Sequence, residues 1–248
     1  MKNTINIFFL VSILFISCSG TKETASLSVE ERFTQAMKNF EDENYLEAIE
    51  DYKIITIQFQ GSSYAPESQY YLAQSRYLRE EYILAASEYD ALVRLMPNSK
   101  YVPQARYMRA MCYYNLSPRS QLDQQYTRQA IEDFQTFIEY TPTADSLVKD
   151  SENKIQELNT KLAKKIYESG RLYFTMEYYK ASIEYFDNLL QKYHDSEYAD
   201  DALLWKAKAL KERKDFSTAL QTIQILIEKY PKSELLSEAQ ELQKEMKE

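Results

Sequence analysis

The sequence contains very little glycine, proline, cysteine and histidine: 3 Gly, 6 Pro, 2 Cys and 1 His among 248 residues. At the usual content of about 7%, a chain of this length would carry roughly 17 glycines. Glycine provides the backbone of tight hairpins, bulges and phosphate-binding loops. Its scarcity therefore argues against a β-sandwich, a β-barrel, a Rossmann domain and a P-loop enzyme.

Cysteine and histidine, which many catalytic and metal sites use, are equally sparse. The motifs HExxH, CxxC, GxSxG and GxxxxGK do not occur. The single histidine, His194, takes the place of a proline that closes other segments, which predicts an exposed turn residue. Cys112 lies in an aromatic helical stretch far from it, which favours a buried apolar side chain over a nucleophilic thiol. We therefore expect no enzyme activity, no cofactor and no metal site.

The net charge of −8, from 30 basic and 38 acidic side chains, offers no basic surface for a nucleic-acid backbone. The chain is instead rich in aromatic residues, with 22 Tyr and 11 Phe. Its 44% hydrophobic and 27% charged residues are ordinary for a folded chain rather than a disordered one. With few turn-forming residues, this composition predicts an all-α protein.

The N-terminal segment resembles an export signal. A mostly apolar run at residues 5–16 follows one positive charge, and it is too short to span a bilayer. Cys18 stands just after this run, as in bacterial lipoprotein signals, where the cysteine is acylated and becomes the mature N-terminus. The usual leucine three residues earlier is Phe15 here, so an ordinary signal peptide with an incidental cysteine is the alternative. We expect a signal peptide at 1–17, lipidation of Cys18 and a tether at 18–27.

Five segments repeat one pattern of small and aromatic residues at helical spacing. The anchoring alanines of the five segments are Ala48, Ala85, Ala130, Ala181 and Ala219. A second small residue stands twelve positions before four of these anchors, at Ala36, Ala73, Ser169 and Ala207, and Ala110 stands twenty positions before Ala130. Small residues at such spacings let two antiparallel helices approach closely. Pro97, Pro142 and Pro231 block further helix at the ends of three segments.

This pattern resembles the tetratricopeptide repeat, and it predicts an all-α solenoid of five helical hairpins. Residues 28–142 would form units 1–3, and residues 143–248 would form units 4 and 5. The stretch from 144 to about 176 has no proline and predicts a long helix, interrupted at most once, that joins the two parts. The last stretch, 234–247, has one apolar face and predicts a C-terminal capping helix.

The third unit carries an insertion that begins Ser-Pro-Arg-Ser-Gln-Leu-Asp-Gln at Ser117. Together with the lipoprotein signal, the five units and the total length, it resembles the BamD family of outer-membrane lipoproteins. The resemblance extends from Cys18 to about Pro231. It implies a scaffold on the periplasmic face of the outer membrane, held there by its lipid anchor only. Ser19, directly after the cysteine, is compatible with sorting to that membrane.

The same resemblance implies partners. In that family the C-terminal half binds the periplasmic domains of the barrel-inserting subunit BamA, within a complex that contains other Bam lipoproteins. The N-terminal half is proposed to receive unfolded outer-membrane proteins by their C-terminal signal. Residues 28–142 would then be the substrate side of this chain, and residues 143–248 the side that assembles the complex.

Helical spacing suggests a peptide-binding groove along the first helices of units 1–3. Its aromatic stripe comprises Phe33, Tyr70 and Tyr107, followed seven residues later by Phe40, Tyr77 and Tyr114, with Met37, Gln74 and Met111 between them. In units 4 and 5 the equivalent positions read Ile166-Gly170-Tyr173 and Leu204-Lys208-Lys211, so the stripe fades. Arg76, Arg106 and Arg109 are candidates to hold a peptide's terminal carboxylate. The alternative is that the stripe belongs to the core.

Contacts with partner proteins are expected at other positions. The candidates are Arg119 in the insertion, and Arg171, Lys180, Trp205 and Lys208 in units 4 and 5. A core position is the alternative for Trp205. The polar insertion at 115–125 predicts a loop beside the groove, or a simple spacer. Two other functions remain open: an envelope adaptor of cell division or secretion, and a lipoprotein that binds a small ligand such as a glycan.

Overall fold

The computed structural model describes residues 27–143 and 145–247; the predicted signal peptide, Cys18 and the tether up to residue 26 lie outside the described residues. Within these ranges the chain forms eleven α helices and no β-strand. The helices are α1 (Val29–Glu41), α2 (Tyr45–Gln58), α3 (Ala65–Leu78), α4 (Tyr82–Leu95), α5 (Val102–Leu116), α6 (Gln125–Tyr140), α7 (Asp145–Thr175), α8 (Tyr179–Lys192), α9 (Ala199–Glu212), α10 (Phe216–Lys229) and α11 (Leu236–Glu245).

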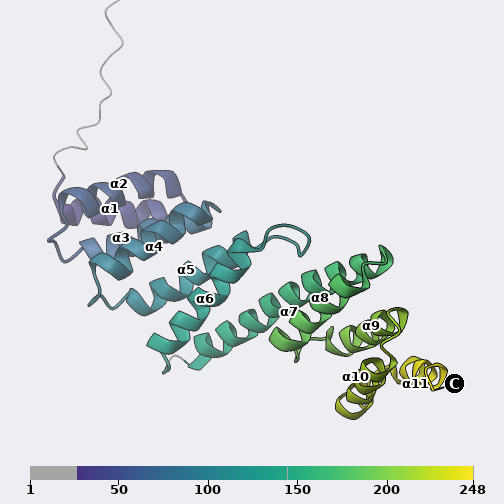
Figure 1. Cartoon of the computed structure of the whole chain (residues 1–248). Helices are drawn as coiled ribbons and strands as arrows, with labels where there is room; N and C mark the ends of the chain where they lie inside the picture. Colours follow the sequence, from purple (N-terminus) through teal and green to yellow (C-terminus); the bar gives the residue numbers. More distant parts are fainter. Residues whose placement is uncertain (1–26, 144, 248) are drawn as a thin grey trace, which may run out of the picture.

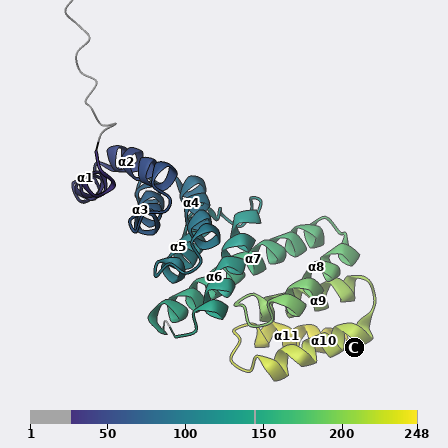
Figure 2. The same ribbon diagram turned by 90° about the vertical axis from the view of Figure 1, so that its left-hand side faces the viewer.

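Consecutive helices pack as antiparallel hairpins, which follow one another from α1 and α2 at one end to α11 at the other (Figure 1). The second view shows the same succession as an elongated array, with α7 between α6 and α8 (Figure 2). Each unit therefore has a first helix (α1, α3, α5, α7, α9) and a second helix (α2, α4, α6, α8, α10). The predicted all-α, tetratricopeptide-like solenoid of five hairpins with a capping helix is confirmed.

The long helix and the capping helix both lie where the sequence predicts them. α7 is a single helix of 31 residues, without interruption, and it packs against α6 in its first half and α8 in its second. α11 covers the apolar end of unit 5, where Ala239 and Leu242 join a cluster with Ile223 and Leu226 of α10. The apolar face of the last hairpin is therefore covered, as a solenoid end requires.

Local sequence signals explain where several helices begin. Ser28 and Glu31 form a capping box at α1, in which the Ser28 Oγ accepts a hydrogen bond from the Glu31 backbone N–H at 3.2 Å. Pro66 and Pro103 stand in the first turns of α3 and α5, where no backbone donor is needed. The Asp215 carboxylate accepts from the Thr218 N–H at the start of α10.

The core of each hairpin is built from small residues that meet large ones. The alanines at the repeat positions have no exposed surface: Ala36, Ala48, Ala73, Ala85, Ala110, Ala130, Ala207 and Ala219. In each unit the second helix buries one large side chain completely, four residues after the alanine anchor in units 1, 2, 3 and 5: Tyr52, Tyr89, Phe134, Phe186 and Ile223. Burying a large apolar side chain contributes about 1.5–3 kcal/mol relative to leaving it in water. Periodic burial of this kind stabilises the solenoid.

The fourth unit corrects the predicted register by one residue. Its buried anchor is Ser182 rather than Ala181, and its close-approach residue is Gly170 rather than Ser169. The Ser182 hydroxyl donates a hydrogen bond to the Gly170 carbonyl at 2.9 Å. A Cβ atom on Gly170 would lie 2.7 Å from the Phe186 ring, so glycine is the residue that fits here.

Ring contacts across the hairpin turns confirm the new register. The last aromatic residue of the first helix meets the first residue of the second helix edge-on in three units. The pairs are Phe40–Tyr45, Tyr77–Tyr82 and Phe174–Tyr179, with centroids 5.7, 5.4 and 5.4 Å apart. The sequence offered two tyrosines in succession, Tyr178 and Tyr179, and the second of them starts α8.

The turns between first and second helices share one unusual backbone conformation. Glu43, Glu80, Glu177 and Lys214 have φ values of 60°, 61°, 63° and 63°. Each stands two residues before the start of the second helix, in units 1, 2, 4 and 5. Left-handed backbone normally favours glycine, because a Cβ atom crowds the carbonyl there. In unit 3 the insertion replaces this turn.

Two single residues agree with their predictions. Cys112 is fully buried, and burial raises the pKa of its thiol to about 12, so the side chain is a protonated, apolar residue of the core. The side chain of His194 is 78% exposed, in the turn between α8 and α9.

Candidate partner-binding surfaces

The aromatic stripe packs one repeat against the next. Its first ring lies against the tyrosine at the junction to the following unit. The pairs are Phe33–Tyr64, Tyr70–Tyr101 and Tyr167–Tyr198, with centroids 5.0, 5.0 and 5.3 Å apart. In the corrected register unit 4 carries Tyr167, Arg171 and Phe174 at the stripe positions. The expectation that the stripe fades in unit 4 is therefore wrong: its rings continue, and its middle residue becomes a cation.

In unit 3 the first half of α7 covers the stripe. The Tyr107 hydroxyl donates to Asp150 at 2.6 Å, and the Tyr114 hydroxyl donates to Glu157 at 2.8 Å. Burial and the bonded Glu157 carboxylate raise the pKa of Tyr114 to about 12. Met111 packs in the same cluster, which includes the buried Leu158 of α7. These three stripe residues thus contact the protein's own helix.

In units 1 and 2 the stripe is open only in part. Tyr70 is 8% exposed, so its ring belongs to the core. The Tyr52 hydroxyl donates to the Met37 sulfur at 2.9 Å, which holds that side chain against α2. Phe33, Phe40 and Tyr77 are half-buried and retain exposed edges. A peptide groove in the N-terminal half stays a prediction, and it would depend on these three rings.

The three candidate arginines differ in what surrounds them. Arg76 is 8% exposed and bonds Glu81 at 2.9 Å and Glu88 at 3.3 Å. Arg109 bonds Asp133 and Asp90, each at 2.7 Å. Arg106 lies over the Tyr140 ring, 4.4 Å from its centroid. A peptide carboxylate would have to displace internal carboxylates from Arg76 and Arg109, so the geometry does not support that role for them.

The insertion in unit 3 is a loop, as predicted, but it packs against α7 rather than beside an open groove. The Lys165 amine donates to the Leu122 carbonyl at 2.6 Å, and the Lys161 amine donates to the Ser117 hydroxyl at 2.8 Å. Inside the loop, the buried Gln124 amide donates to the carbonyls of Arg119 and Leu122. The Arg119 side chain is exposed. The loop thus attaches unit 3 to the helix that begins unit 4.

Three of the predicted partner-binding residues meet in one cluster. The Arg171 guanidinium lies 3.5 Å from the centroid of the Trp205 ring, and the Lys208 amine lies 4.0 Å from it. Phe174 meets the same indole edge-on at 5.1 Å. Trp205 is half-buried between α7 and α9. Tyr71 takes the equivalent place between α1 and α3, where its ring meets Phe40 edge-on at 5.0 Å. Trp205 is therefore both a packing residue and part of a cationic, aromatic surface.

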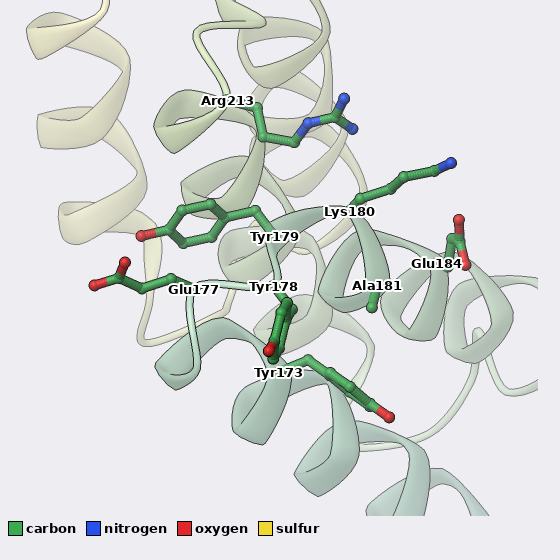
Figure 3. Close-up of a pocket in the computed structure, with 8 residues that line it drawn as sticks. All are labelled: Tyr173, Glu177, Tyr178, Tyr179, Lys180, Ala181, Glu184 and Arg213. Carbon is green, nitrogen blue, oxygen red and sulfur yellow. The ribbon is translucent and has the colours of Figure 1, made fainter.

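The fourth candidate, Lys180, lies apart from this cluster, in a pocket of about 600 Å³ at the turn between α7 and α8. Figure 3 shows Lys180 and Arg213 extending to the same side, with Tyr173 and Tyr178 below them and Glu177 on the other side. Within the described part of the chain, neither Lys180 nor Arg213 has an ion pair. The sequence analysis did not predict that Tyr173, Tyr178 and Arg213 line this pocket.

No helix in the ranges 27–143 and 145–247 is long and apolar enough to cross a membrane. No group of three or more histidine, cysteine, aspartate or glutamate residues in those ranges is placed to hold a metal ion.

The profile of the YfiO family, described as outer membrane lipoprotein, matches residues 26–215. The chain belongs to the YfiO outer membrane lipoprotein family. A tetratricopeptide-repeat profile matches residues 201–233, which span α9 and α10. The YfiO match therefore covers units 1–4 and α9, and it ends before α10. None of the curated proteins compared with the chain matches it.

Solved structures with a similar fold include several tetratricopeptide proteins. The TPR2AB domain of yeast Sti1, in complex with pHSP90, is 17% identical over 82% of this chain and 78% of that one, with a TM-score of 0.44. A tetratricopeptide repeat protein from Parabacteroides merdae is 17% identical over 88% and 72%, with a TM-score of 0.39. The likeness concerns the repeat architecture alone, and the YfiO assignment rests on the sequence.

Proposed function

We propose that this YfiO-family protein is a lipid-anchored scaffold of the β-barrel assembly machinery on the periplasmic face of the outer membrane. It would bind a BamA-like subunit and other Bam lipoproteins, and it would receive unfolded outer-membrane proteins for folding and insertion. The observation that carries the proposal is the family match over residues 26–215. Acylation of Cys18, eight residues before that match, would supply the anchor.

The surfaces described above support a division of labour along the solenoid. Arg171, Trp205 and Lys208 combine a large aromatic ring with two cations, and tryptophan and arginine are among the residues that contribute most to the binding energy of protein interfaces. This cluster suits a folded partner such as a BamA-like subunit. The half-buried rings Phe33, Phe40 and Tyr77 suit weak, apolar contacts with an unfolded chain.

Copurification tests the scaffold function. The tagged full-length protein would be isolated from detergent-solubilised outer membranes, and its partners identified by mass spectrometry. We expect a BamA-like barrel subunit among them. Arg171→Glu should reduce its recovery about tenfold, because a charge is reversed inside the cluster. Lys149→Glu, on an exposed turn near the start of the same helix, makes the same charge change outside the cluster and should leave recovery unchanged.

The anchor is tested in the same cells. Cys18→Ser should release the protein from the membrane fraction, because no acyl chain can then be attached. Recovery of the membrane-bound protein without a BamA-like subunit, or with partners of cell division or secretion instead, would contradict the scaffold function proposed here.

A further inference from the structure

The C-terminal helix α11 lies against the part of α9 that carries the cationic, aromatic cluster. Its carboxylates Glu238 and Glu245 form ion pairs with Lys208 and Lys211 of α9. A hollow of about 440 Å³ remains between the two helices, and Phe174 and Trp205 are among its lining residues. An acidic helix thus covers a basic, aromatic surface within one chain.

The attachment of α11 is slight compared with that of its neighbour. α11 buries two of its ten residues, Ala239 and Leu242, whereas α9 buries seven of its fourteen. The carboxylates of its two ion pairs are 50% and 59% exposed, and ion pairs that are open to water add little stability. Few buried contacts favour local opening.

The cations beneath α11 are not needed by the repeat fold. The middle position of the stripe is uncharged in units 1–3, where Met37, Gln74 and Met111 occupy it. Units 4 and 5 have Arg171 and Lys208 there, and Lys211 takes the last position, which is aromatic in the other four units. Cations at positions that packing fills with neutral side chains elsewhere point to a role in recognition.

The position of α11 relative to the family is consistent with this role. The YfiO match ends at residue 215, and the repeat match ends at residue 233. α11, at Leu236–Glu245, lies beyond both. The basic surface on α9 therefore lies within the family match, and the helix that covers it lies outside.

We propose that α11 is an internal ligand of the C-terminal partner surface, and that a partner displaces it with an acidic amphipathic helix of its own. The partner's helix would place apolar residues where Ala239 and Leu242 now pack. It would place carboxylates, spaced as Glu238 and Glu245 are, against Lys208 and Lys211. This is recognition of a helix in a groove. The inference rests on the proposed scaffold function for the existence of a partner, and it adds the partner's chemistry and its regulation.

A peptide with the sequence of residues 234–247 provides the probe. Fluorescence anisotropy would measure its binding to the full-length protein in detergent. Glu238→Gln with Glu245→Gln should let the labelled peptide bind about tenfold more tightly, because apparent affinity rises with the fraction of molecules in which α11 is displaced. Adding Lys208→Gln and Lys211→Gln to this double variant should weaken binding about tenfold, because α11 has already lost its ion pairs there and only those of the peptide remain to be removed. Glu234→Gln removes one carboxylate that forms no ion pair within the described residues, and it should change nothing.

Three results would overturn the inference: no binding of the peptide to any variant, equal binding to the wild type and the double glutamine variant, or binding that ignores Lys208 and Lys211. Circular dichroism melting would confirm that each variant is folded. The copurification experiment distinguishes failure of the inference about α11 from failure of the proposed scaffold function. Peptide binding as expected without a BamA-like subunit in the pull-down would contradict the scaffold function alone.

Discussion

Units 1–3 and units 4–5 use different cations for the same fold. Residues 28–142 contain 8 Arg and 3 Lys, whereas residues 143–248 contain 2 Arg and 15 Lys. The difference follows from where the charges lie. In the N-terminal part, Arg32, Arg76 and Arg109 are drawn into the packing between helices, where a planar, weakly hydrated guanidinium bonds carboxylates well. In the C-terminal part, Lys206, Lys208 and Lys211 pair with carboxylates that are 52%, 50% and 59% exposed.

The ion pairs show the contrast quantitatively. The side chains of Arg32 and Asp51 are 3% and 11% exposed, and those of Arg109 and Asp133 are 17% and 4% exposed. In the C-terminal part, the side chains of Lys206 and its partner Asp187 are 19% and 52% exposed, so one partner of the pair lies open to water. The ion pairs Arg32–Asp51 and Arg109–Asp133 are therefore structural, whereas Lys206, Lys208 and Lys211 each pair with a carboxylate that is at least half exposed. This is the physical reason to place the partner surface in units 4 and 5.

The largest loss of stability is expected from replacing the buried cation Arg109, which can be compared with Lys206 at the equivalent position of the C-terminal part. Arg109 joins α5 to α4 and α6, and Lys206 joins α9 to α8 in the next part of the solenoid. Arg109→Met should lower the free energy of unfolding by about 3–5 kcal/mol, because Asp133 is left buried without a countercharge. Lys206→Met should change it by no more than about 1 kcal/mol. Chemical denaturation of both variants would measure the difference, and equal losses would show that the contrast is false.

The pH dependence of the first variant gives a second check. Burial raises the pKa of Asp133 in the folded protein, and removal of Arg109 raises it further. A carboxyl group with a raised folded pKa destabilises the protein as the pH rises through its unfolded pKa towards the folded one. The cost of Arg109→Met should therefore shrink in acid, where Asp133 is protonated and neutral. A cost that stays constant between neutral and acidic pH would exclude an uncompensated charge as its cause.

A smaller loss of stability is expected at the small residue that lets the two helices of a hairpin approach each other closely. Units 1–3 place alanine at that position, and unit 4 places Gly170, because the Phe186 ring leaves no room for a Cβ atom. Gly170→Ala should cost about 1–3 kcal/mol by overpacking. Gly61→Ala is the matched control, since no atom lies within 4 Å of its added Cβ, and it should be neutral. Thermal melting of the two variants would test this, and a neutral Gly170→Ala would refute the steric argument.

The fold was largely predictable because its signals are periodic. Small residues, aromatic anchors and closing prolines recur at helical spacing, so hairpins, the long α7 and the cap could all be located. The register of unit 4 could not be predicted from these signals. Tyr178 and Tyr179 both satisfy the aromatic position, and Ala181 and Ser182 both satisfy the small one. Only packing against Gly170 decides between them.

The candidate sites were less predictable, because helical periodicity assigns a residue to a face and not to a partner. Arg76 and Arg109 lie on a suitable face, but the carboxylates of neighbouring helices already bond them. One signal was available: Arg32 bonds Asp51 and Gln69 bonds Glu88, each nineteen residues further along, from the first helix to the second. Lys211 and Glu245 lie thirty-four residues apart, as do Arg171 and Trp205, but both pairs connect one unit to the next element across two turns, so this spacing becomes a signal only once the register is known.

The smallest expected effect concerns a feature that both parts share. Glu43 in unit 1 and Lys214 in unit 5 have left-handed backbone, which costs an L-residue roughly 1–2 kcal/mol. Glycine removes that cost but loses more entropy on folding, by roughly 0.5–1 kcal/mol. Glu43→Gly and Lys214→Gly should therefore each stabilise the protein by about 0.5–1 kcal/mol, whereas Glu43→Ala, which keeps a Cβ atom, should not. If denaturation curves showed that only one of the two glycine variants is more stable than the wild type, the two parts would differ in their backbone as well as in their charges.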